Sequence, residues 1–136
     1  MSFKKTSVQP FKAIINIGLQ WNYTDKLISK SEVIKALSSY QKSKMKDNDI
    51  TLSVSVKETL IVLADQLEPH LELSIINYPR FPLDIAELKS ETQLLVEFLM
   101  EKFNQNRVVI EYLDEIVMLE KSSQIDPRVQ KYNPDS

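Results

Sequence analysis

Apolar and polar residues alternate near the start of the chain. Every second residue from Phe11 to Trp21 is aliphatic or aromatic, which is the spacing of side chains on one face of a β-strand. The residues between them are mixed, with Ile14 among polar neighbours, so we expect a central strand that is partly covered on both faces. Gly18 lies within this strand and indicates either a bulge or a close approach of another group to the backbone.

A helix and a second strand are predicted next. A polar connection ends at Ser31, a residue type that caps helices, and apolar residues at helical spacing follow from Val33 to Tyr40. The segment from Ile50 to Val56 then alternates apolar residues with Thr and Ser, which predicts a strand with one buried face.

Residues 57–67 fit two structures. Their apolar spacing suits a helix, for which Ser55 and Glu58 would form a capping box. Residues 59–63 also form a short apolar run that suits a strand, with a hairpin turn over residues 65–69. We favour the strand, because the segment is short and another strand follows it, but the pattern leaves both structures open.

The second half of the chain predicts two further strands around a helix. Alternation over residues 71–77 indicates a strand, which the proline-rich segment 78–82 must end, because proline donates no hydrogen bond to a sheet. Asp84 and Glu87 have the spacing of a capping box for a helix to about Phe103. Alternation resumes after this helix and predicts a strand over residues 107–113 and a short edge strand over residues 116–119.

The order of these elements is β-α-β-β-α-β with an extra edge strand. This order predicts an α+β fold of the ferredoxin-like two-layer sandwich type, with an antiparallel sheet covered by two helices on one face. The similarity is one of topology, and no residue motif points to a family. We expect a flexible N-terminal arm over residues 1–10, a single domain over residues 11–120 and a flexible C-terminal tail over residues 121–136.

The composition excludes several kinds of site but does not identify one. The chain of 136 residues has no cysteine and one histidine, so disulfides, thiolate nucleophiles and Cys-based metal sites are excluded. We expect no metal site and no cofactor. The formal net charge of −2 gives no attraction to nucleic acid, which is not an expected partner. No apolar run reaches the length of a membrane span, and we expect a cytoplasmic protein.

Four residues are candidates for a site. His70 is the one side chain that titrates near neutral pH, and Glu68 and Glu72 would share its face of an extended segment and orient its ring. Tyr78 and Arg80 lie in the proline-bounded segment, where a guanidinium beside aromatic rings would clamp an anion. Arg107, at the start of a strand, is the other candidate anion clamp.

The leading functional hypothesis is a dimeric protein-interaction or small-ligand-binding module without catalysis. It rests on the lack of a catalytic motif and on apolar residues left on the open sheet face, which a homodimer would bury. These residues are Ile14, Ile76, Val109 and Leu113. The ligand would be a protein partner or a small anion.

The alternative hypothesis is a small cofactor-independent enzyme of isomerase or monooxygenase type. His70 would be its general base, and Arg80 or Arg107 would hold an anionic group of the substrate.

Overall fold

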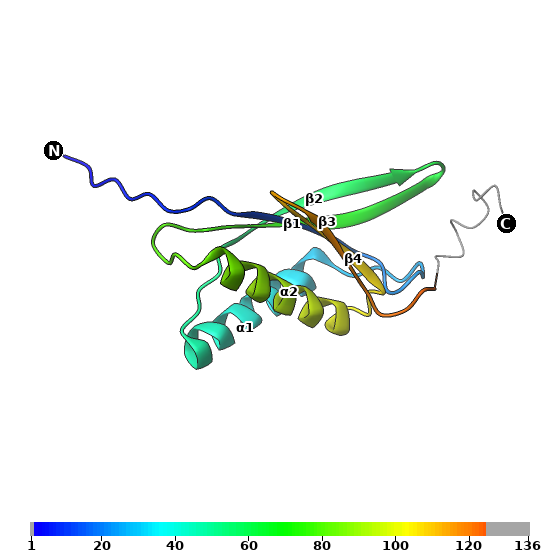
Figure 1. The fold of residues 1–136 in the computed structure, drawn as a ribbon. Coiled ribbons are helices and arrows are strands. Elements are labelled where there is room, and N and C mark those ends of the chain that lie inside the picture. Colours follow the sequence, from blue (N-terminus) through cyan, green and yellow to red (C-terminus); the bar gives the residue numbers. More distant parts are fainter. Residues whose placement is uncertain (1, 125–136) are drawn as a thin grey trace.

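A computed structural model of the chain describes residues 2–124 and confirms the predicted ferredoxin-like order (Figure 1). The elements are β1 (Lys12–Gly18), α1 (Lys30–Asn48), β2 (Val54–Leu63), β3 (Gln66–Ile76), α2 (Ile85–Lys102), β4 (Arg107–Tyr112) and β5 (Ile116–Glu120). The described region is therefore an α+β fold, with β5 as the extra edge strand. Predictions for residues 125–136 lie outside the described residues.

The five strands form one antiparallel sheet in the order β2-β3-β1-β4-β5. Both helices lie on the same side of this sheet, while the β2–β3 hairpin extends past them (Figure 1). We call the side of the sheet away from the helices the open face. Because side chains alternate along each strand, each strand sends every second residue to this face.

The core lies between the sheet and the two helices. The apolar alternation predicted for β1, β3 and β4 places one set of side chains out of contact with water, together with the apolar stripe of α2. The largest of the fully buried side chains are Ile15, Ile17, Leu71, Leu73, Ile75, Leu95, Leu99 and Ile110.

The second predicted strand begins later than its alternation indicates. Helix α1 continues to Asn48 and ends with Asp49 in the left-handed conformation, so residues 49–53 carry the chain back to the sheet and β2 begins only at Val54. Leu52 is buried, and its carbonyl oxygen accepts a hydrogen bond from Gln41 Nε2 at 2.8 Å. The apolar alternation thus predicted the burial of Leu52 correctly, but Leu52 is buried without pairing to another strand.

Residues 57–67 form a strand and a hairpin, as favoured, and not a helix. The hairpin turn lies at Ala64 and Asp65, because Leu63 pairs with Gln66. Pro69, expected in the turn, lies within β3. Its carbonyl oxygen accepts from Leu19 N at 2.9 Å, so the backbone nitrogen of Pro69, which carries no hydrogen, also points towards β1. The hydrogen bonds between β3 and β2 are therefore complete.

The two helix caps differ from those predicted. Ser29, and not Ser31, caps α1: its hydroxyl accepts from Glu32 N at 3.1 Å, and Glu32 Oε2 accepts from Ser29 N at 2.9 Å. Asp84 stands at the start of α2 but makes no side-chain capping bond. A capping box therefore forms at the first helix and not at the second.

Candidate functional site

His70 stands on the open face among side chains from three strands. The antiparallel register places it directly beside Gly18 of β1 and Thr59 of β2. Glu72, two residues further along β3, lies beside Asn16 and Lys57, and its carboxylate forms an ion pair with Lys57 Nζ at 3.2 Å. Alternation along β3 thus brings Glu72 to the same face as His70, as expected.

The His70 ring is fixed by a backbone contact. Its Nδ1 lies 3.1 Å from the carbonyl oxygen of Glu68, and because a carbonyl only accepts hydrogen bonds, this contact requires a proton on Nδ1. In the neutral ring Nε2 is then an acceptor. This nitrogen lies 3.6 Å from the point where a Cβ on Gly18 would stand.

Gln105 approaches the same point from the segment between α2 and β4. It follows α2, is buried, and donates from Nε2 to the carbonyl oxygens of Gln20 at 3.0 Å and Phe103 at 3.1 Å. These bonds fix the orientation of the amide, because a flipped amide would set its oxygen against two carbonyls. Its Oε1 lies 2.9 Å from the Cβ position of Gly18. We call the group of residues Gly18, His70 and Gln105 the Gly18 notch.

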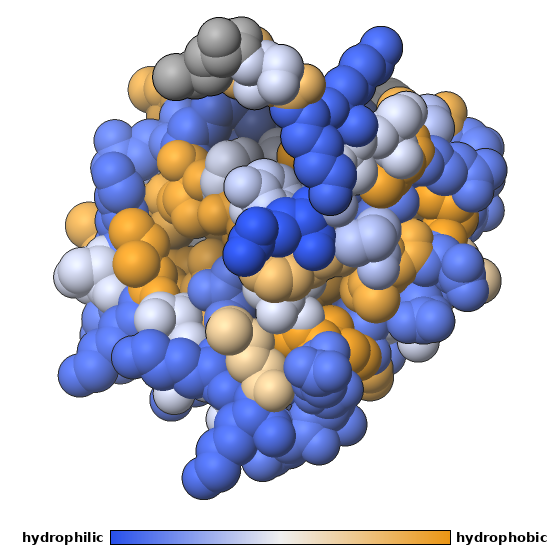
Figure 2. Space-filling view, turned by 90° about the vertical axis from the view of Figure 1, so that its left-hand side faces the viewer, coloured by the Kyte–Doolittle hydropathy of each residue, from blue (hydrophilic) through white to orange (hydrophobic). Residues whose placement is uncertain are grey.

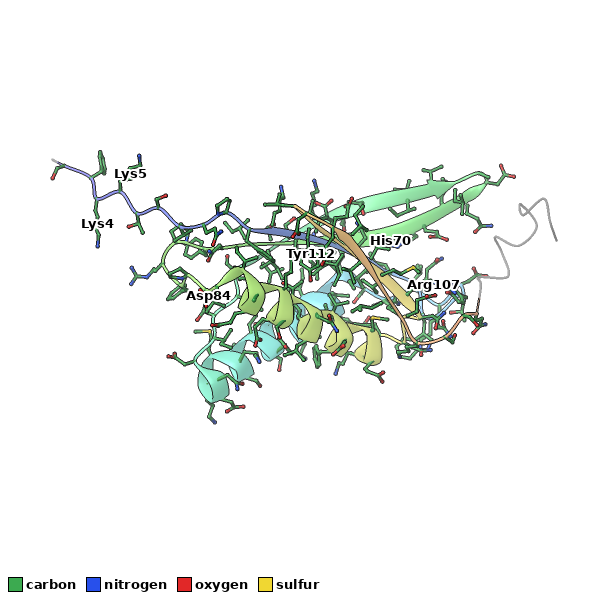
Figure 3. The ribbon with its side chains drawn as sticks, viewed as in Figure 1. Lys4, Lys5, His70, Asp84, Arg107 and Tyr112 are labelled. Carbon is green, nitrogen blue, oxygen red and sulfur yellow. The ribbon has the colours of Figure 1, made fainter. Side chains whose placement is uncertain are left out.

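Arg107 lies towards the same end of the sheet as His70 (Figure 3). Its Nε pairs with Glu120 and its Nη1 donates to the Tyr23 hydroxyl at 2.9 Å. The hydrogen bond to Glu120 raises the pKa of Arg107 further above its usual range. Arg107 is therefore held in place, and only its remaining N–H groups are available to a ligand.

The loop that carries Tyr23 is strained. Asn22 and Tyr23 both have positive φ, 24° and 56°, a conformation that residues with a Cβ rarely adopt. The Tyr23 hydroxyl also accepts from Asn106 Nδ2 at 3.1 Å. These contacts hold the loop against the start of β4 and so position Arg107.

Tyr78 and Arg80 lie at the other end of the sheet. Tyr78 is eight residues beyond His70 along the same direction of chain, a separation of about 25 Å in an extended strand. It stacks on Phe81 with ring centroids 6.0 Å apart, and the Arg80 guanidinium lies 5.8 Å from the Phe81 ring. Figure 3 shows Asp84 and the N-terminal lysines towards this end, away from His70. His70 and Arg80 therefore cannot act on one small substrate within one chain.

The Tyr78–Arg80 segment instead borders a shallow cleft beside the N-terminal arm. Asn77 ties the arm to this segment, because its Nδ2 donates to the carbonyl oxygens of Gln9 at 2.9 Å and Leu83 at 3.2 Å. Figure 2 views this end of the molecule and shows apolar areas interspersed with polar ones around the arm. The cleft has a volume of about 570 Å³ and is lined by Lys4, Thr6, Tyr78, Pro79 and Arg80.

The carboxylates near the end of β4 are engaged in ion pairs. Asp114 and Glu115 both hold Lys89 Nζ, at 3.0 and 3.2 Å, and Lys89 lies 4.9 Å from the centroid of the Tyr112 ring. The hydrogen bond from Lys89 lowers the pKa of Asp114, and the same bond raises the pKa of Lys89. Within residues 2–124, no group of three or more His, Cys, Asp or Glu residues is arranged to hold a metal ion. No helix in this region is long and apolar enough to cross a membrane.

Sequence reasoning identified part of this arrangement. Gly18 in a strand indicated either a bulge or a close approach, and the groups nearest to its Cβ position are the Gln105 amide and the His70 ring. Gln105 itself carried no signal, because it stood in a polar stretch that predicts only the end of a helix. The orientation of its amide depends on hydrogen bonds to the carbonyl oxygens of Gln20, which is 85 positions earlier in the chain, and Phe103, which is 2 positions earlier.

Comparison with known proteins identifies the fold but no family. No family model and no curated protein sequence matches the chain. One solved structure that matches it is a phage SAM lyase in complex with S-methyl-5'-thioadenosine, at 18% identity and a TM-score of 0.65; the match covers 92% of this chain and 100% of that one. A phage SAM lyase in its apo state matches at 17% identity and a TM-score of 0.65, covering 91% and 99%.

These matches correct the leading functional hypothesis. The sequence predicted a binding or interaction module without catalysis, whereas the solved structures that share this fold along their whole length are of an enzyme. The alternative hypothesis of a small enzyme agrees better with this finding. The sequence carried no local motif that would have pointed to an enzyme.

Proposed function

We propose that this protein is an enzyme that cleaves S-adenosylmethionine (SAM) and releases S-methyl-5'-thioadenosine. The observation that carries the proposal is the extent of the fold agreement, which covers 92% of this chain and 100% of a SAM lyase bound to that compound. The proposal replaces the isomerase and monooxygenase classes of the alternative hypothesis by a lyase. It keeps the cytoplasmic location and the absence of a cofactor that were predicted from the sequence.

The identity of the product defines the bond that breaks. S-methyl-5'-thioadenosine retains the methyl and adenosyl groups of SAM, so the broken bond joins the sulfonium sulfur to the γ-carbon of the amino-acid chain. The bonding electron pair stays on sulfur, which becomes a neutral thioether. The four-carbon fragment then either closes its own carboxylate onto the γ-carbon or loses a proton from the β-carbon.

The open face near His70 suits such a substrate. SAM carries positive charge on sulfur and on its amino group, and the site presents oxygen acceptors and the Glu72 carboxylate. His70 Nε2 is an acceptor that can take a proton from the substrate, since Nδ1 already carries one. The proposal assigns the remaining N–H groups of Arg107 to the substrate carboxylate. Tyr78 and Arg80 take no part, because they lie at the other end of the sheet.

The test is direct detection of the products. Purified full-length protein is incubated with SAM, and S-methyl-5'-thioadenosine is measured by liquid chromatography with mass spectrometry. S-adenosylhomocysteine is the matched control, because it has no sulfonium and hence a far poorer leaving group. The proposal predicts turnover of SAM alone, and formation of the product at the rate of a protein-free blank would refute it.

The four-carbon product distinguishes the two routes. With SAM deuterated at both β-hydrogen positions, ring closure yields a lactone that keeps both deuterium atoms, whereas loss of a β-proton yields an unsaturated amino acid that keeps one. We expect His70→Ala and Arg107→Ala to lower turnover by about tenfold or more. Arg80→Ala, at the other end of the sheet, should retain the activity of the unmodified protein, and a loss there would contradict the assignment of the site.

We also propose that copies of the chain associate, as the sequence predicted for a homodimer. The support is the exposure of large apolar residues on the β2–β3 hairpin and on the open face. Leu60, Val62 and Leu67 share one side of the hairpin where the helices do not cover it, with exposed fractions of 56%, 62% and 62%. Val109 and its cross-strand partner Met118 are exposed on the open face.

A further inference from the structure

We propose that the shallow cleft beside the N-terminal arm binds the phosphate group of a small organic phosphate monoester. This cleft, which we call the arm cleft, is lined by Lys4 and Thr6 of the arm and by Tyr78, Pro79 and Arg80. It lies towards the opposite end of the sheet from His70, and SAM carries no phosphate. The proposal therefore concerns a second site and does not rest on the proposed function.

The side chains that line the arm cleft offer positive charge and hydrogen-bond donors. Lys4 and Arg80 bring an ammonium and a guanidinium group, and Thr6 and Tyr78 bring hydroxyl groups. No acidic residue is among the described residues that line the cleft. Such a lining favours an anion over a cation or a neutral ligand.

Both cations lack a carboxylate partner within the described part of the chain. The ion pairs found there involve other lysines and Arg107, and none of them involves Lys4 or Arg80. Asp84 stands four positions after Arg80, at the start of α2, and does not pair with it. The Arg80 guanidinium lies 5.8 Å from the centre of the Phe81 ring instead, a contact that leaves its N–H groups available to an anion.

The segment that carries Arg80 is held in one conformation. Pro79 and Pro82 fix their own φ angles. Phe81 N donates to the Tyr78 carbonyl oxygen at 2.9 Å, and the two aromatic rings stack with their centroids 6.0 Å apart. A ligand would thus meet a backbone that is already ordered, which lowers the entropy cost of binding.

Asn77 joins the two sides of the arm cleft. Its buried side-chain amide donates to the Gln9 carbonyl oxygen of the arm at 2.9 Å and accepts from Leu83 N at 3.1 Å. Further along the arm, Figure 3 shows the side chains of Lys4 and Lys5 on opposite sides. Lys4 is the one of the two that lines the cleft.

A phosphate monoester matches these donors better than a carboxylate does. It carries a charge of about −1.5 to −2 at pH 7 and has three terminal oxygens, whereas a carboxylate has one charge and two oxygens. The planar fork of Arg80 can bind two phosphate oxygens while the Lys4 ammonium meets a third. The volume of about 570 Å³ lies within the range of roughly 300–1,000 Å³ that is usual for small-ligand sites, so the organic part also has room.

The test is a titration of ¹⁵N-labelled full-length protein with ribose 5-phosphate, followed through the backbone amide signals. Ribose and sodium acetate at equal ionic strength are the controls, because neither carries a phosphate. We expect saturable shifts at Lys4, Thr6, Tyr78 and Arg80, and a dissociation constant at least about tenfold lower for ribose 5-phosphate than for acetate. The amide signal of His70 reports the other end of the sheet and should not move.

Variants separate the arm cleft from the overall charge of the protein. Arg80→Ala should weaken the binding of ribose 5-phosphate by about tenfold or more, and Arg80→Lys, which keeps the charge but not the fork, should weaken it less. Lys35→Ala removes an exposed positive charge from α1 and should bind as the unmodified protein does. The proposed function predicts that Arg80→Ala still cleaves SAM, and since no binding measurement requires turnover, the two proposals can fail independently.

Three results would overturn the inference. The first is the absence of a saturable shift at the residues of the arm cleft, and the second is an equal affinity for acetate and ribose 5-phosphate. Both are measured on the unmodified protein and need no variant to fold. The third is an equal loss of binding in Arg80→Ala and Lys35→Ala, which would assign the binding to net charge alone.

Discussion

Arg107 donates a hydrogen bond from Nη1 to the hydroxyl oxygen of Tyr23 over 2.9 Å, and so joins the start of β4 to a loop 84 positions earlier in the chain. The loop residues Asn22 and Tyr23 hold a conformation that is unfavourable for them in isolation. The hydrogen bonds of the Tyr23 hydroxyl offset part of that cost. The loop and the position of Arg107 therefore depend on each other.

Tyr23→Phe should show this dependence. Loss of the hydroxyl removes an acceptor for Arg107 and Asn106, and we expect the free energy of unfolding to fall by about 1 kcal/mol, together with a loss of SAM turnover. Urea denaturation and the product assay measure the two effects. Tyr78→Phe is the matched control, and an equal effect of the two substitutions would show that the Tyr23 hydroxyl has no special role.

The cap of α1 distinguishes two neighbouring serines. Ser29→Ala removes the hydroxyl that accepts from Glu32 N, and we expect a loss of about 1 kcal/mol in thermal or chemical unfolding. Ser31→Ala, two residues later within the helix, should change stability by less than about 0.5 kcal/mol. The opposite ranking would place the start of the helix at Ser31, as the sequence alone indicated.

An ion pair joins the two helices. Lys44 Nζ lies 2.9 Å from Glu91 Oε2, with side-chain exposed fractions of 15% and 12%. Glu91→Gln should cost roughly 2 kcal/mol, because it leaves Lys44 without its carboxylate, whereas the double change Lys44→Met with Glu91→Leu should be nearly neutral. Lys42→Met, at an exposed position of α1, is the control for loss of a lysine.

The same pair has a defined pH dependence. The hydrogen bond to Glu91 raises the pKa of Lys44 above 10.5. Its contribution to stability is therefore complete below the pKa of the unfolded chain and is lost as the pH rises through the higher folded pKa. The stability difference between the unmodified protein and Glu91→Gln should shrink in that alkaline range, and a difference that is constant with pH would contradict the assignment.

The Lys89–Asp114 pair acts in the acid range. Its hydrogen bond lowers the pKa of Asp114 below 3.8, so the stabilisation is present above the unfolded pKa and is lost as the pH falls through the folded value. Lys89→Met should return the Asp114 pKa towards 3.8 in a carbon-detected NMR titration. Lys102→Met, which removes another lysine of α2, should leave the Asp114 pKa where it is in the unmodified protein.

Self-association should depend on the exposed side of the hairpin. Val62→Asp places a charge between Leu60 and Leu67, and we expect the solution mass measured by light scattering to fall to that of one chain. Val109→Asp tests the open face in the same way. Ile34→Asp charges an exposed apolar position on α1 and is the control; a monomeric mass for the unmodified protein would refute the association.

The elements of the fold were predictable where one face of a strand is buried. In β1, β3 and β4 every second side chain contacts the helix layer and is apolar. The buried face of these strands could therefore be predicted from the sequence. The start of β2 was not predictable, because Leu52 is buried beside α1 without belonging to the ladder. The start of β2 depends on where α1 ends, and no residue near position 50 indicates the end of that helix.

The site was predictable only in fragments. His70 and Gly18 drew attention through residue type, and their neighbourhood follows from the register of β1 and β3. The pairing of His70 with Arg80 was not excluded by the sequence, although the sheet places them at opposite ends. Gln105 acquires its role from backbone carbonyls that the fold brings to it, and such contacts leave no pattern along the chain.

Ala64 holds a φ of 53° in the turn of the β2–β3 hairpin, although the chain's single glycine lies elsewhere. A residue with a Cβ loses about 1–2 kcal/mol in this conformation. A residue with a Cβ thus occupies the strained turn, whereas the single glycine lies in the Gly18 notch. Because the turn lies outside the notch, Ala64→Gly offers a more stable parent protein, in which site variants that would otherwise unfold become accessible to purification and assay.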